Sequence, residues 1–80
     1  MKRIIWTEAA KADVRRLDKP TAMHVLFCLH RFAESGEGDV KALQGRDELR
    51  LRAGDYRLFF VSTADTIRIT AVKLRREAYR

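Results

Sequence analysis

The sequence predicts a single α+β domain with the order β-α-α-β-β-β, in which a helix hairpin packs on one face of a small, mainly antiparallel twisted sheet. Apolar residues repeat with a helical period in the first half of the chain and alternate with polar residues in the second half. Pro20 separates two helical segments, and turn-forming residues separate three extended segments. Eighty residues support one hydrophobic core, so residues 1–80 are expected to form one domain.

The chain begins with a predicted strand and a short helix. Residues 2–6 place a short apolar run after two cations, which is typical of a strand. Thr7 belongs to the residue types that cap helix N-termini. The inward face of the helix that follows it would comprise Ala10, Val14 and Leu17.

A second helix is predicted over about residues 20–34. Pro20 suits its first turn, where the missing amide proton is not needed. The segment 35–38 ends it, because glycine tolerates the left-handed geometry of a helix stop. Its inward face comprises Ala22, Val25, Leu26, Leu29 and Phe32. A sharp proline turn between the two helices favours a hairpin.

Three strands are predicted in the second half, over residues 49–53, 56–62 and 66–73. A two-residue turn at Gly54-Asp55 would place Arg52 opposite Arg57 and Arg50 opposite Phe59. A four-residue turn at Ser62-Thr63-Ala64-Asp65 would then pair Val61 with Thr66 and place Arg68 opposite Phe59 as well. One face of the sheet is thus expected to hold Arg50, Arg52, Arg57, Phe59 and Arg68. The other face would hold Leu49, Leu51, Leu58, Phe60, Ile67, Ile69 and Ala71.

Composition excludes several classes of protein. The single Cys28 cannot form an internal disulfide, which argues against a disulfide-stapled secreted scaffold. The longest apolar run, at residues 25–29, is too short to cross a bilayer, and no signal peptide is recognisable at the N-terminus. We therefore expect a cytoplasmic protein that has no membrane partner.

The positive charge is concentrated in the second half. Residues 1–40 carry a net charge of +1 and residues 41–80 a net charge of +5, and 12 of the 17 cations are arginine. Arginine matches phosphate oxygens in pairs, so this excess is typical of a protein that binds a polyanion. Because like charges opposite each other destabilise a sheet, the Arg52–Arg57 pair favours a binding site over a merely solvated surface. Phe59 would offer a base a surface for stacking.

The C-terminal tail extends the basic character. Residues 73–80 contain Lys73, Arg75, Arg76 and Arg80 together with Tyr79, and they follow directly from the third of these strands. The tail is either a solubilising terminus or a segment that folds back over the basic face. Positive charge would favour the phenolate of Tyr79, which could then accept a proton from a ribose hydroxyl.

Several motifs together resemble the RelE/ParE superfamily of bacterial type II toxins. They are Asp39-Val40-Lys41, Leu43-x-Gly45, Leu49-Arg50-Leu51-Arg52-Ala53-Gly54-Asp55-Tyr56-Arg57 and Arg75-Arg76-Glu77-Ala78-Tyr79-Arg80. The resemblance implies a compact toxin that a cognate antitoxin holds inactive. In the RelE branch the activity is cleavage of messenger RNA in the ribosomal A site, without a metal or other cofactor. The ParE branch inhibits DNA gyrase on the same scaffold, and an inactive binding member is a third alternative.

The resemblance also assigns roles to residues of this chain. Arg50 and Arg52 stand at catalytic basic positions, Arg57 at the arginine that stabilises the scissile phosphate, and Tyr79 at the general base. Arg75, or Lys73 in an alternative alignment of the tail, matches a second arginine. Lys41 and Lys73 are the candidate proton donors, because arginine does not give up its proton. The residues expected to bind RNA are Lys41, Phe59, Arg68, Lys73, Arg76 and Arg80.

Overall fold

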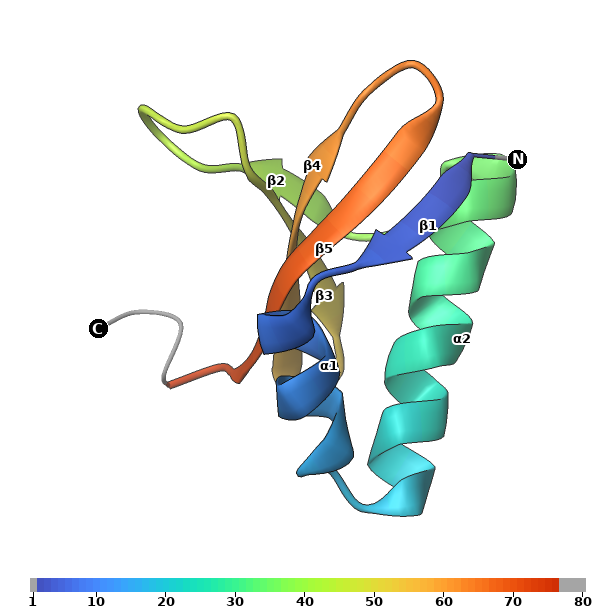
Figure 1. The fold of residues 1–80 in the computed structure, drawn as a ribbon, viewed down its shortest axis with the longest axis vertical. Helices are drawn as coiled ribbons and strands as arrows, with labels where there is room; N and C mark the ends of the chain where they lie inside the picture. Colours follow the sequence, from blue (N-terminus) through green and yellow to red (C-terminus); the bar gives the residue numbers. More distant parts are fainter. Residues whose placement is uncertain (1, 77–80) are drawn as a thin grey trace.

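A computed structural model describes residues 2–76, and within them one five-stranded sheet carries two helices on one of its faces (Figure 1). The strand order across the sheet is β1-β5-β4-β3-β2. The elements are β1 (Arg3–Trp6), α1 (Glu8–Arg15), α2 (Lys19–Ser35), β2 (Val40–Ala42), β3 (Leu49–Ala53), β4 (Tyr56–Ser62) and β5 (Thr66–Leu74). The predicted α+β class and the helix hairpin on one face are confirmed. No helix within residues 2–76 is both long and apolar enough to span a bilayer.

The ends of both helices follow the sequence signals. The Thr7 hydroxyl accepts a hydrogen bond from the amide of Ala10 at 3.2 Å and caps α1. Asp18 caps α2 by accepting from the amide of Thr21 at 3.3 Å, and proline stands in the first turn. Gly36 ends α2 with a φ of +77°, in the left-handed region that glycine adopts readily.

The core lies between the helices and the covered face of the sheet. Its buried residues are Ala10, Val25, Cys28, Leu29, Leu51, Ala53, Leu58, Phe60, Ile67, Ile69 and Val72. Phe32 of α2 adds a tilted ring contact to Phe60, with the ring centroids 5.3 Å apart. The predicted inward face of α1 is confirmed, because Ala10 is buried and Val14 and Leu17 pack against the core, but the buried Asp13 was not expected there.

The β3–β4 register is as predicted. Arg52 pairs with Arg57, and Arg50 pairs with Phe59 across the Gly54-Asp55 turn. The strict alternation of leucine with arginine leaves this hairpin one register that buries the leucines.

The β4–β5 register differs from the prediction. Arg68 pairs with Val61 rather than with Phe59, because the loop after β4 closes on a Ser62–Ile67 pair. Inside that loop the Thr63 hydroxyl accepts hydrogen bonds from the amides of Asp65 and Thr66.

A β-bulge then changes which face the rest of β5 presents. Phe60 pairs with Ile69 but Phe59 pairs with Ala71, so Thr70 is the extra residue. Its hydroxyl lies 3.1 Å from the carbonyl oxygen of Phe59 and also donates to Glu48. The bulge places Ala71 on the face of the sheet that the helices do not cover, which we call the open face. Val72 takes the core position that was predicted for Ala71.

Two edge strands complete the sheet. β1 pairs with β5 in parallel, which makes the sheet mixed rather than purely antiparallel. β2 pairs with β3 in antiparallel fashion, with Lys41 opposite Arg50. The strand β2 was not predicted from the sequence, because its three residues are too few to show a period.

Gly38 lies in the loop that leads from α2 to β2, and its substitution probes how tightly this loop packs on the core. A Cβ atom there would lie 2.8 Å from Cδ1 of the buried Leu51, and its φ is +154°. We expect Gly38→Ala to lower the free energy of unfolding by roughly 1–3 kcal/mol, through overpacking added to backbone strain. The matched control is Gly36→Ala, where φ is also positive but a Cβ would meet nothing within 4 Å. Equal losses in urea unfolding of the two variants would contradict this prediction.

Candidate functional site

The open face of the sheet carries a basic pocket of about 190 Å³. Its lining residues are Asp39, Lys41, Arg50, Arg52, Arg57 and Arg75. We call this cavity, with the six residues that line it, the basic pocket. Five of them are cations that the sequence analysis named as candidate site residues. A cavity in which cations outnumber carboxylates five to one is suited to bind a phosphate-bearing ligand.

Four segments converge to form the basic pocket. β3 contributes Arg50 and Arg52, and the register with its neighbours brings Lys41 of β2 and Arg57 of β4 opposite them. Arg75 comes directly after β5, and its backbone amide donates to the carbonyl oxygen of Asp55 at 2.7 Å. The turn between β3 and β4 therefore holds the backbone at Arg75, where the chain leaves the end of β5.

Arg57 is the most deeply buried of the five cations, with only 5% of its surface exposed. Its Nη1 donates to the carbonyl oxygens of Gly54 and Tyr56, each at 3.1 Å. These bonds hold the guanidinium in one orientation. A guanidinium carries five N–H donors, so binding through Nη1 leaves capacity to donate to a ligand. Arg57 is thus a preorganised anion-binding group.

Asp39 is the residue of the basic pocket that the sequence analysis did not place there. Its backbone carbonyl accepts from the amide of Arg52 at 2.9 Å, which ties the segment before β2 to β3. The sequence signal that pointed to it is the motif Asp39-Val40-Lys41, which carries part of the resemblance to the RelE/ParE superfamily.

The remaining predicted RNA-binding residues lie around the basic pocket or away from it. Phe59 is half-buried on the same face, opposite Arg50. Arg68 is exposed and pairs with Val61, further along the sheet. Arg76 lines a second, shallower cavity with Asp55, Leu74 and Arg75. The predicted residues Tyr79 and Arg80 lie outside the described residues.

Comparison with known protein families identifies the family of this chain. The model of the ParE toxin of the type II toxin–antitoxin system parDE matches residues 4–79. This chain belongs to the ParE toxin family. The resemblance to the RelE/ParE superfamily is thereby confirmed, and the protein is a toxin of a type II toxin–antitoxin system. No curated protein sequence matches the toxin.

Solved structures share the fold of the toxin at low sequence identity. The antitoxin–toxin complex RelB–RelE from Methanococcus jannaschii matches with a TM-score of 0.76 at 19% identity, over 94% of each chain. The archaeal RelE–RelB complex from Pyrococcus horikoshii matches with a TM-score of 0.78 at 23% identity, over 92% of the toxin and 94% of that chain. The intact RelBE complex from E. coli gives 0.74 at 20% identity, over 92% and 96%.

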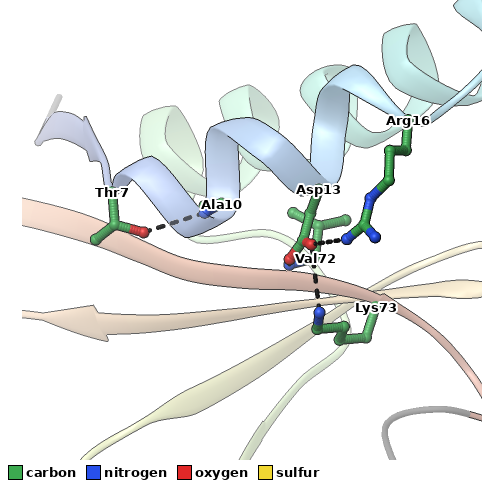
Figure 2. Close-up of polar contacts among 6 residues, drawn as sticks. All are labelled: Thr7, Ala10, Asp13, Arg16, Val72 and Lys73. Atoms are coloured by element: carbon green, nitrogen blue, oxygen red, sulfur yellow. Dashed lines mark hydrogen bonds and ion pairs between the residues drawn. The ribbon is translucent and has the colours of Figure 1, made fainter.

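Lys73 of the toxin is directed to α1 by a buried carboxylate. Its ammonium lies 3.3 Å from Oδ1 of Asp13, as Figure 2 shows. Asp13 also accepts hydrogen bonds from the backbone amide of Val72, at 2.9 Å, and from the guanidinium of Arg16. Burial raises the pKa of Asp13, but the hydrogen bonds from Val72, Lys73 and Arg16 outweigh it, so the pKa lies below its ordinary value. Asp13 is therefore ionised at neutral pH.

Proposed function

We propose that the toxin is an endoribonuclease that cleaves ribosome-bound messenger RNA. The observation that carries this proposal is the basic pocket, where arginines from three segments and Lys41 line one cavity. Cleavage through the 2′-oxygen needs no protein nucleophile. It does need the extra negative charge on phosphorus to be neutralised, and fixed guanidinium groups supply that neutralisation.

The proposed reaction assigns each residue a role. The ribose 2′-oxygen forms a bond to phosphorus and loses its proton to a base, while the bond from phosphorus to the 5′-oxygen breaks. The products are a 2′,3′-cyclic phosphate and a 5′-hydroxyl. Arg57 would stabilise the charge that develops on phosphorus, Arg50 and Arg52 would hold the phosphate, and Arg75 would assist. Tyr79, assigned by the resemblance, would act as the base.

The 5′-oxygen that leaves must receive a proton, and Lys41 is the donor that the geometry favours. Lys41 lines the basic pocket, whereas the ammonium of the other candidate, Lys73, is paired with Asp13. Phe59, on the same face as the basic pocket, would stack on a base, and Arg68 and Arg76 would bind the RNA backbone. The same role is proposed for Arg80, which lies outside the described residues.

We also propose a cognate antitoxin as the protein partner. Matching solved structures that are described as RelE–RelB complexes support this proposal. A toxin that acts on translating ribosomes would work in the cytoplasm.

A second candidate function is inhibition of DNA gyrase. The description of the matching family as ParE toxins favours it, and the same basic pocket could receive a different polyanion or an acidic protein surface. An inactive member that only binds its partner is the third candidate. Because one fold supports all three, the functional site has to discriminate among them.

Controlled expression of the toxin in bacteria separates these functions. We expect new messenger RNA ends within codons soon after induction, with 5′-hydroxyl termini. Filamentous cells, trapped gyrase–DNA complexes and intact message would instead establish gyrase inhibition. Unimpaired growth at the same toxin level would identify the inactive alternative.

A further inference from the structure

β5 extends beyond the strand that pairs with its outer edge. β1 pairs with β5 only from Thr66 to Ile69. At that point the amide and the hydroxyl of Thr7 both donate to the carbonyl oxygen of Ile69, and the chain turns into α1. Within residues 2–76, the part of β5 from Ala71 to Leu74 pairs with β4 along one edge, and β1 does not extend along its other edge.

Asp13 of α1 binds the backbone of β5 at the edge along which β1 does not extend. Its Oδ2 accepts the amide hydrogen of Val72 at 2.9 Å, which satisfies a backbone donor on the open edge. Its Oδ1 binds the ammonium of Lys73 at 3.3 Å and the guanidinium of Arg16. Figure 2 shows the carboxylate between helix and strand, and only 5% of the Asp13 surface is exposed.

The segment that Asp13 holds leads directly into the basic pocket. Lys73 pairs with Arg57 across the sheet, Leu74 pairs with Tyr56, and the next residue is Arg75. Arg75 is fixed by its backbone bond to Asp55 and lines the basic pocket. Asp13 thus holds one edge of β5 near its end, while the pairing with β4 and the bond from the Arg75 amide to Asp55 hold the other edge. Together these contacts set the direction in which the chain reaches the basic pocket.

We propose that Asp13 is a positioning residue for the basic pocket. By binding Val72 and Lys73 it fixes the end of β5, so that Arg75 stays in the pocket, and it directs the Lys73 ammonium to α1. Its effect on RNA binding rests on the proposed function. Its effect on the order of residues 73–75 does not.

The first test is nitrogen-15 relaxation of the full-length toxin. In Asp13→Ala, which removes both side-chain oxygens, we expect the order parameters of the backbone amides of residues 73–75 to fall from about 0.85 toward 0.6, and the amides of α2 to keep their values. A comparison variant is Val25→Ala, which removes fully buried side-chain atoms of the other helix, α2. Unchanged order at residues 73–75 in Asp13→Ala, or an equal loss in Val25→Ala, would overturn the proposal.

The second test is a double-mutant cycle on binding of a short 2′-O-methyl RNA, which cannot be cleaved through its 2′-oxygen. Asp13→Ala should weaken binding about three- to tenfold in the wild-type background and have no further effect in Arg75→Ala. Arg16→Gln, which alters a partner whose side chain is 72% exposed, should leave binding unchanged. Additive losses would show that Asp13 does not act through Arg75. A wild-type toxin that fails to bind this RNA would count against the proposed function, and the relaxation test would still decide the role of Asp13.

Discussion

Arg57→Ala is expected to reduce messenger RNA cleavage by about 10²–10³-fold, which is the usual effect of removing one preorganised donor to a developing negative charge. Arg57 is the most deeply buried cation of the basic pocket, and Nη1 bonds to the carbonyl oxygens of Gly54 and Tyr56 fix its orientation. The group does not have to be ordered when substrate arrives, so its full electrostatic effect is available in the transition state. The loss should fall mainly on kcat, because stabilisation confined to the transition state leaves substrate binding nearly unchanged.

Two further variants define the cause of this loss. Arg57→Lys keeps the charge but lacks the planar fork, so we expect it to recover only a small part of the activity. Arg31→Gln removes an exposed arginine of α2 and should cleave at the wild-type rate. Cleavage is measured on programmed ribosomes with purified toxin, and thermal unfolding shows that each variant is folded. Wild-type cleavage by Arg57→Ala would remove this residue from the mechanism.

The part of the site that the sequence predicted correctly rests on one hairpin. Leucine and arginine alternate through β3, and Gly54-Asp55 is a recognisable two-residue turn, so a single register buries the leucines. That register brings Arg52 opposite Arg57 and Arg50 beside them. Local pattern and global fold agree here, which is why the convergence of these arginines was predictable.

Other features depend on contacts that no local pattern reveals. The bulge at Thr70 lies within a run of residues that are all compatible with a strand, so alternation alone does not show where the side chains change face. The burial of Asp13 depends on a backbone amide 59 residues away, at Val72. An acidic residue among apolar helix positions would ordinarily be placed at the solvated border of the helix.

Asp13→Ala is expected to lower the free energy of unfolding by roughly 1–3 kcal/mol, which is the usual cost of leaving a buried hydrogen-bond donor without its acceptor. The substitution leaves the amide of Val72 without its acceptor on the open edge of β5 and the ammonium of Lys73 without its counter-ion. The bond to Arg16 adds little to the loss, because that side chain is largely exposed to solvent. Urea unfolding at pH 7 measures the difference. A loss below about 1 kcal/mol would mean that solvent replaces Asp13 at this edge.

The pH dependence of stability separates the contribution of the Asp13 charge from that of its hydrogen bond to Val72. Because the pKa of Asp13 is lowered in the folded toxin, its ionised form stabilises the fold above the pKa of the unfolded chain, and this contribution is lost as the pH falls from about 5. Asp13→Asn keeps an oxygen that can accept from Val72 but carries no charge. The stability difference between wild type and Asp13→Asn should therefore shrink as the pH is lowered from 7 to 3. Hydrogen bonds from Thr21 also lower the pKa of Asp18, but Asp18 is common to both proteins and cancels in the comparison. A constant difference across this range would show that the charge of Asp13 does not contribute to the stability of the toxin.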